Sequence, residues 1–331
     1  YRCVRMIAEA ASSVAFTPDD ADHPAVQLLM RPNPDQSTQE VLEAFYAHLQ
    51  TAGNAFLHAL TLEDGAPREL MVMRPDRMTP LLDTRGWLVG WRHDAGRDRQ
   101  SFRREADGWC SVLHMKLFNP RDDHLGYSPL AAAARSIDTH NASGAWAKAL
   151  LDNSARPSGA LIYGQDGACM TDDQFDRLKA ELEASHTGAG NAGRPMLLEG
   201  GLEWKPMALS PSDMDYSAAR HDAAREIALA FGVPPMMLGI PGDNTYSTYK
   251  EANLAFWRLT VLPLVEKTAR ALSSWLSARF ETPITFTPNL DGVSALSAER
   301  EALWRRLDAA GFATTEEKRA LAGLSTETNI T

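Results

Sequence analysis

Residues 231–247 read FGVPPMMLGIPGDNTYS and separate two long segments that both have the pattern of helices. A helix cannot continue through Pro234-Pro235, because each proline lacks an N–H donor and pushes the residue before it out of helical geometry. The rest of the stretch is rich in residues typical of loops: Gly239, Pro241, Gly242 and Asn244. The sequence therefore predicts a helix–loop–helix, in which the loop is either a connector or the working part of the molecule.

The overall composition is that of a globular protein. The chain has 331 residues, of which 44% are hydrophobic and 23% are charged. This suits one large domain or two to three modules with a sizeable core. The net charge of -10 disfavours tight wrapping of nucleic acid, which usually requires a basic protein. The same charge is compatible with DNA that passes as a weakly bound cargo.

The cysteines and the apolar runs indicate the cellular compartment in which the protein folds. The three cysteines, Cys3, Cys110 and Cys169, show no C-x-x-C spacing. A disulfide framework and a zinc ribbon are therefore disfavoured, and we expect a reducing cytoplasm. No apolar run approaches the length of a membrane-spanning helix. The first residues show neither a signal peptide nor an initiator Met, so we expect a piece of a longer gene product.

Helices and a β region are predicted before this stretch. Residues 1–15 place apolar side chains on one helical face, and a second helix begins at Ser37 in a capping box and ends at Gly53. Residues 55–118 contain runs typical of strands, separated by turns, and predict a small antiparallel β region. Two prolines there indicate strand edges or bulges: Pro75 and Pro80.

An insert-like module is predicted between two further helices. One helix covers 130–154, and the other covers 210–232 with Ser210 as its cap. The segment between them predicts a β-α-β-β unit, with its elements at 158–164, 171–186 and 195–209.

A long helix is predicted after the loop. Apolar residues repeat at three- and four-residue steps over 248–280, with a kink expected at Pro263. The wide stripe, which includes Trp257 and Trp275, fits both a core face and a subunit interface. A strand over 282–289 follows. Two last helices are predicted at 297–311 and 314–324, with Gly311 and Gly323 as C-terminal caps.

The sequence carries few signals of catalysis. The nine histidines show no HxxxH or HExxH spacing. Ser128, in LGYSPL, lacks the second glycine of a nucleophile elbow, so we expect it to cap a helix. The loop GAGNAGR (188–194) has no lysine and leads into an apolar run, unlike a phosphate-binding loop. We therefore predict no catalytic residue, no metal site and no cofactor.

Two other functions remain alternatives from the residues alone. One is a serine hydrolase that pairs Ser128 with a histidine. The other is a transcriptional regulator that uses the last two helices as a helix-turn-helix. The second of these helices carries Glu316 and Glu317 where a recognition helix would approach phosphates, which disfavours that function.

The order of the motifs resembles the portal proteins of tailed bacteriophages, in particular the group shared by long-tailed phages and gene transfer agents. The similarity covers nearly the whole chain. The matching segments are RPNPDQ (31–36), GNAF (53–56), LGYSPL (125–130), GNAGRPMLLEGG (190–201), LSPSDMDY (209–216), FGVPPMMLG (231–239), NTYSTYKEANLAFWRLTVLPLVEKTARALSSWL (244–276) and GFATTEEKRALAGL (311–324).

The resemblance implies an α+β portal fold in a ring oligomer. The fold would have a β-rich wing, a helical stem, a small α/β clip, a long kinked wing helix and a helical crown. The implied segments are the wing (1–129), the first stem helix (130–154), the clip (155–209), the second stem helix (210–235), the tunnel loop (236–247), the long wing helix with its strand (248–289) and the crown (290–331).

The resemblance also implies a structural rather than an enzymatic role. A ring of about twelve copies would sit at one capsid vertex of a virion or phage-like particle assembled in the bacterial cytoplasm. It would conduct double-stranded DNA during packaging and ejection, as a non-specific cargo. Its other partners would be the major capsid protein, head–tail adaptor proteins and the terminase ATPase, with no membrane.

An acidic subunit repeated around a ring gives a negative channel that repels phosphates and lets DNA slide. We therefore expect the stem to line the channel with Asp213 and Asp215. The candidates for facing DNA at the tunnel loop are Ile240, Asp243, Asn244, Thr245, Tyr246 and Lys250. The candidates for adaptor contacts at the clip are Asp166, Asn191 and Arg194.

Overall fold

The protein consists of two compact units. The first contains Tyr1–Ala133 and Ala228–Thr331, and the second contains Ala134–Ile227. The computed structural model describes residues 1–62, 65–152, 159–163, 171–186, 202–206, 216–240 and 246–322.

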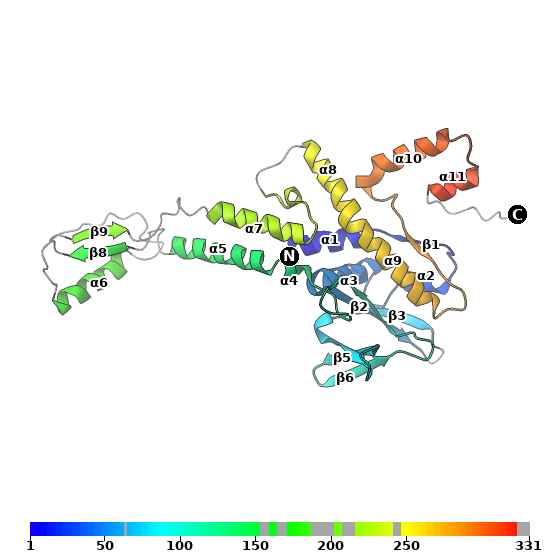
Figure 1. The fold of residues 1–331 in the computed structure, drawn as a ribbon, viewed down its shortest axis with the longest axis horizontal. Helices are drawn as coiled ribbons and strands as arrows, with labels where there is room; N and C mark the ends of the chain where they lie inside the picture. The colour runs from blue at the N-terminus through cyan, green and yellow to red at the C-terminus, as the bar shows by residue number, and fades with distance from the viewer. Residues whose placement is uncertain are drawn as a thin grey trace. The chain divides into compact units, whose positions relative to one another are not determined.

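Helices form one layer of the first unit (Figure 1). α1 (Arg2–Ser12) packs on α3 (Thr38–Ala52) and on α9 (Leu262–Ser277). The predicted capping box of α3 is present, and Gly53 ends this helix in the left-handed conformation with φ 71°. α2 (Pro24–Met30) has the imidazole of His23 as its N-cap, which accepts a hydrogen bond from the Ala25 N–H. β1 (Phe16–Pro18) and β10 (Phe286–Pro288) pair antiparallel.

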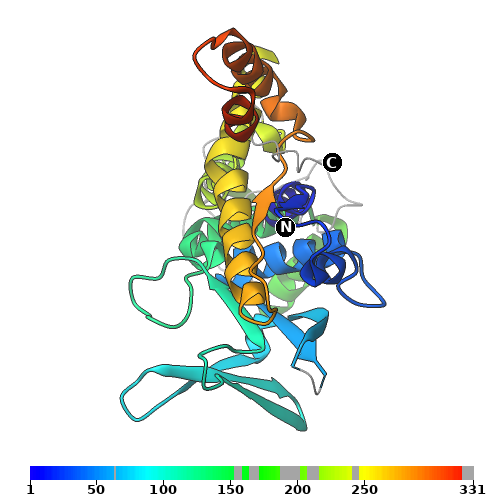
Figure 2. The ribbon, with the colours of Figure 1, turned by 90° about the vertical axis from the view of Figure 1, so that its right-hand side faces the viewer.

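Two three-stranded antiparallel sheets lie beside these helices (Figure 2). The first has the order β3-β2-β7, from Pro67–Met73, Asn54–Thr61 and Val112–Lys116. The second has the order β4-β5-β6, from Met78–Leu82, Leu88–Ala95 and Asp98–Arg103. Their shared core contains Phe56, Met78, Trp91, Phe102 and Val112.

The predicted antiparallel β region is therefore confirmed. Pro80 lies in the edge strand β4, as expected for a residue without an N–H donor. Pro75 lies instead in a 3₁₀ turn, η1 (Pro75–Arg77), between two strands.

The second unit contains helices and a short hairpin. Its described elements are α5 (Ala134–Asp152), β8 (Gly159–Tyr163), α6 (Asp172–His186), β9 (Leu202–Pro206) and most of α7 (Tyr216–Ala230). β8 and β9 pair antiparallel. The Ser136 hydroxyl of α5 donates to the Glu226 carboxylate of α7 at 2.5 Å, so the two helices lie side by side. The short helix α4 (Pro129–Ala132) precedes α5 in the first unit.

The long helix predicted over 248–280 is interrupted. It consists of α8 (Tyr246–Phe256), a π-helical turn η4 (Trp257–Val261) and α9. The Leu262 N–H donates to the Trp257 carbonyl, five residues back. Pro263 has no N–H to donate, and the predicted irregularity takes the form of this wide turn just before it.

The C-terminal part of the chain contains η5 (Ser294–Leu296), α10 (Ser297–Ala309) and α11 (Thr315–Leu321). The prediction that Gly311 caps α10 is wrong. The cap is Ala310, which leaves the helix with φ -77° and ψ 85°, so no left-handed residue is needed. Only 286–288 of the predicted strand 282–289 is a strand. Gly323, Ser210 and the loop 188–194 lie outside the described residues.

Candidate functional site at the base of the 231–246 loop

The loop begins with a tight turn at the end of α7. Gly232 has φ 68°, and its N–H donates to the Leu229 carbonyl at 3.0 Å. The Val233 N–H donates to the Ala228 carbonyl at 2.9 Å, and the Val233 side chain is only 1% exposed. Pro234 then leads into a 3₁₀ turn, η3 (Pro235–Leu238), which ends at Gly239 with φ 72°. The chain is thus fixed to buried structure before the polar part of the loop.

The π-helical turn η4 also contacts the start of the loop. The Thr260 hydroxyl donates to the Gly232 carbonyl at 2.6 Å. A Cβ atom added to Gly232 would lie 2.7 Å from the Thr260 Oγ1 atom, so the close approach and the positive φ both require glycine. We call Gly232, Val233 and Thr260 the loop base. It joins the start of the loop to the π-helical turn that follows α8, 28 residues later in the sequence.

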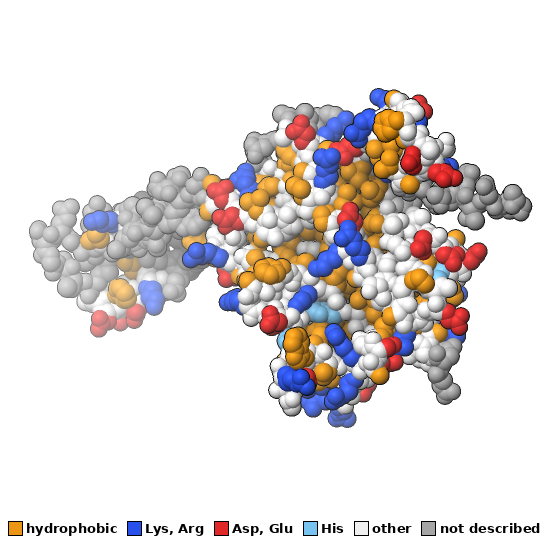
Figure 3. All heavy atoms as spheres, turned by 45° about the vertical axis from the view of Figure 1, so that its right-hand side comes forward, with side chains coloured by type: hydrophobic (Ala, Val, Ile, Leu, Met, Phe, Trp, Pro, Cys, Tyr) orange, Lys and Arg blue, Asp and Glu red, His pale blue; other side chains and the backbone are white. Residues whose placement is uncertain are grey.

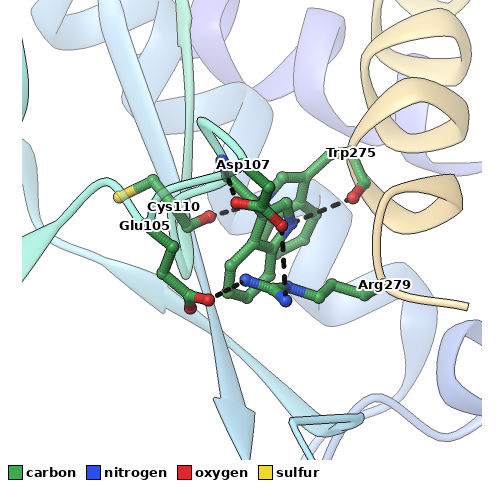
Figure 4. Close-up of polar contacts among 6 residues, drawn as sticks. Glu105, Asp107, Cys110, Trp275 and Arg279 are labelled. Carbon is green, nitrogen blue, oxygen red and sulfur yellow. Dashed lines mark hydrogen bonds and ion pairs between the residues drawn. The ribbon is translucent and has the colours of Figure 1, made fainter.

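A cluster of aromatic and charged side chains fixes the far end of α9 (Figure 4). The Arg279 guanidinium lies 3.8 Å from the centre of the Trp109 ring and forms ion pairs with Glu105 at 2.5 Å and Asp107 at 3.6 Å. The Trp109 indole N–H donates to the Trp275 carbonyl at 3.1 Å, and that of Trp275 donates to the Cys110 carbonyl at 2.8 Å. We call Trp109, Trp275 and Arg279 the tryptophan clamp. It joins the helix that follows the loop to the segment between β6 and β7.

A second set of contacts fixes the LGYSPL segment. The Asn54 Oδ1 atom accepts from the Gly126 N–H at 2.7 Å and from the His114 Nε2–H at 2.9 Å. Burial lowers the pKa of His114 to about 3, so the ring stays neutral and its Nε2–H remains a donor to the amide. A Cβ atom on Gly126 would lie 2.0 Å from the Gly53 carbonyl oxygen. The segment is thus packed directly against the end of α3.

Ser128 is a helix cap, as predicted. Its hydroxyl accepts from the Leu130 N–H at 3.0 Å and donates to the Thr51 carbonyl at 2.5 Å. The hydroxyl is occupied in both directions, which argues against the hydrolase hypothesis. Among the residues that the structure describes, no group of three or more acidic, His or Cys side chains is arranged to hold a metal ion.

The structure places only part of the predicted site. Ile240 is half-buried, Tyr246 is the first residue of α8, and Lys250 is exposed on the same helix. The other candidates lie outside the described residues: Asp243, Asn244, Thr245, Asp213, Asp215, Asp166, Asn191 and Arg194. Their proposed contacts with DNA and adaptors stay predictions.

Several residues of the site were not identified from the sequence. The loop base could have been suspected from Gly232, which directly precedes a β-branched residue and two prolines. The tryptophan clamp joins residues more than 160 positions apart, and no sequence pattern pairs them. Across the described parts of the chain, no helix is long and apolar enough to span a membrane.

Comparison with known proteins identifies the family. The family model described as "Phage portal protein" matches residues 1–323. A protein of Rickettsia bellii is 41% identical over 332 residues, covering 98% of this chain and 86% of its own. The portal protein of Enterobacteria phage HK97 is 24% identical over 335 residues, covering 96% of this chain and 76% of its own.

Comparison with solved structures supports the same family. A chain in the neck of a native gene transfer agent (GTA) particle, computed with C12 symmetry, is 50% identical with a TM-score of 0.74. The match covers 98% of this chain and 89% of that chain. The α+β fold described above is therefore the portal fold, and the chain belongs to the phage portal protein family.

Proposed function

We propose that this chain forms a ring at one vertex of a phage or GTA capsid, and that double-stranded DNA passes through the ring. The observation that carries the proposal is the loop base. Gly232, bonded to Thr260, and the buried Val233 fix the start of the loop to the first unit, and the sequence then carries the polar residues Asp243, Asn244 and Thr245 before α8 begins. A loop anchored in this way can narrow a channel and still let its tip adapt to a moving duplex.

The ring itself is supported by a relative. The similar GTA neck was computed with C12 symmetry, and we propose about twelve copies for this chain as well. Such a ring does not match the symmetry of duplex DNA, so base-specific contacts have no use in it. A subunit charge of -10, repeated around the ring, favours a negative channel in which phosphates are repelled and friction is low.

The parts of the chain take the corresponding roles in this proposal. Residues 1–129 and 248–289 would form the wing, 155–209 the clip and 290–331 the crown. α5 and α7 would be the two stem helices. Their coupling through Ser136 and Glu226 supports a stem that moves as a pair of helices.

The partners follow from the same role. The clip would bind head–tail adaptor proteins, the wing would meet the major capsid protein, and a separate terminase ATPase would dock during packaging and supply the energy. The ring would conduct DNA in both packaging and ejection, without catalytic activity of its own. ATP hydrolysis by the purified chain alone would contradict this division of labour.

Deletion of the loop tip tests the DNA role. Removal of residues 241–246 should leave rings visible by negative-stain microscopy but lower the amount of DNA packaged and retained in particles. The matched control shortens the β5–β6 hairpin at residues 95–98, which should change neither the rings nor the DNA. Unchanged DNA content in the loop deletion would overturn the DNA role, and wild-type protein that forms no rings would overturn the ring.

A further inference from the structure

The two C-terminal helices lack a core of their own within one subunit. Neither α10 nor α11 contains a buried side chain. Three large apolar residues are exposed here: Trp304 is 47%, Leu321 is 64% and Phe312 is 94% exposed. Since most helices in proteins are stabilised by packing of an apolar face, we expect this face to be covered in the assembled particle.

A groove next to α10 has room to bind exposed apolar side chains of this kind. It has a volume of about 620 Å³ and lies between α10 and the junction of η4 with α9. Its apolar surface comes from Leu262, Leu296 and Leu303, and three arginines line it: Arg258, Arg300 and Arg306. Hydrophobic side chains also gather on the face that carries these helices in Figure 3.

The charges of the groove are only partly balanced. Arg258 forms an ion pair with Glu299 at 2.8 Å, and Arg300 pairs with Asp291. Arg306 has no ionic or hydrogen-bonded partner within the described residues. An occupant that is apolar and carries a carboxylate would therefore complement the groove.

The segment 312–321, which we call the tip, has this chemistry. It begins with the exposed Phe312 and carries Glu316 and Glu317 in the first turn of α11. The Glu317 carboxylate already accepts from the Thr314 N–H at 2.8 Å in a capping box. Among the described residues, Glu316 has no ion-pair or hydrogen-bond partner for its side chain, so it can pair with an arginine of another copy.

We infer that the tip of one copy packs into the groove of the next copy, with Phe312 on the leucines and Glu316 on Arg306. This inference rests on the proposed ring. A closed ring needs a heterologous contact, in which one surface of a subunit meets a different surface of its neighbour. The tip and the groove are two such surfaces, and in the single chain both are open. The contact would give α10 and α11 the burial that they lack.

Cross-linking between copies tests the contact directly. The full-length double variant Leu303→Cys/Phe312→Cys is assembled and treated with a short bismaleimide, and the masses of the products are measured. We expect a ladder of covalent multimers. The matched control is Leu303→Cys/Trp87→Cys, which places the second cysteine at an exposed aromatic residue of the β4–β5 turn. Its yield of covalent multimers should not exceed that of the wild-type protein.

The outcomes separate this contact from the ring. If wild-type protein forms no rings, the proposed function fails. If rings form but the double variant gives only monomers, or only cross-links within one chain, the tip–groove contact is wrong and the ring stands.

Charge exchange gives an independent measurement. Arg306→Glu and Glu316→Arg should each raise the protein concentration needed for half-maximal assembly about tenfold, and the combined variant should restore it to within about twofold. Phe312→Ala should raise it at least about tenfold, since a buried aromatic anchor is lost. Equal assembly by all these variants would overturn the inference. Near-ultraviolet circular dichroism of each variant checks that the subunit remains folded.

Discussion

The helices α9 and α10 belong to the same unit, yet they differ in what surrounds them. α9 buries seven residues, among them Leu272 and Trp275, against the helices and sheets of the unit. α10, which is only a few residues shorter, buries none. Since burial of apolar surface is the main source of stability, we expect α9 to contribute much more than α10 to the stability of the single subunit. We expect α10 and the tip to contribute chiefly after subunits meet.

A large-to-small substitution in each helix gives the largest expected contrast. Leu272→Ala should lower the free energy of unfolding by about 3 kcal/mol, because the Leu272 side chain is almost completely buried and its removal leaves a cavity in the core. Leu303→Ala should cost less than about 1 kcal/mol in the unassembled subunit, because this side chain is only half-buried. Urea denaturation followed by tryptophan fluorescence measures both. Similar losses for the two variants would remove the distinction between the helices.

Two glycines extend the comparison to the backbone. Gly126→Ala should destabilise the subunit by about 2–3 kcal/mol, since the new Cβ atom would meet the Gly53 carbonyl and force the backbone apart. Gly311→Ala, next to the tip, should be neutral or slightly stabilising, because nothing lies near it and its φ is not positive. Melting temperatures of the two variants test this. A stable Gly126→Ala protein would show that the LGYSPL segment is not held as closely as described.

Two arginines in and just after α9 allow the same comparison of buried and exposed side chains for charged residues. Arg279→Ala should cost about 2 kcal/mol, because the guanidinium is mostly buried over Trp109 and its two carboxylate partners would lose their cation. Arg270 is the matched control on the same helix. It is 80% exposed and pairs only with Glu266, so Arg270→Ala should cost less than about 0.5 kcal/mol. Equal losses in chemical denaturation would show that the clamp contributes no more than a surface ion pair.

Local patterns in the sequence predicted much of this architecture. The capping box at Ser37, an irregularity of the long helix near Pro263 and the cap at Ser128 each depend on neighbours within a few residues, so local patterns predicted them, although the kink expected at Pro263 is a π-helical turn just before it. The contacts that join distant segments could not be predicted in this way. The pairing of Asn54 with Gly126 and of Trp109 with Trp275 depends on how the sheets meet the helices. Gly311 was misjudged because glycine also occurs in turns that need no positive φ.

Two identical capping motifs give the smallest and most specific test. Ser37 and Thr314 both accept a hydrogen bond from the N–H of the glutamate three residues later, and both are exposed at a helix start. Ser37→Ala should lower the global stability by about 1 kcal/mol, because α3 is part of the core. Thr314→Ala removes the same bond from α11, which is anchored only weakly, so it should leave the global unfolding free energy unchanged. Its effect should appear as faster amide hydrogen exchange in residues 315–321 of the free subunit. In assembled rings, where we place the tip in the neighbour's groove, the same amides should be protected from hydrogen exchange. The loss of either cap should then lower the stability of its helix by a similar amount. A Thr314→Ala subunit that loses as much global stability as Ser37→Ala would show that the tip is already part of the monomer's core.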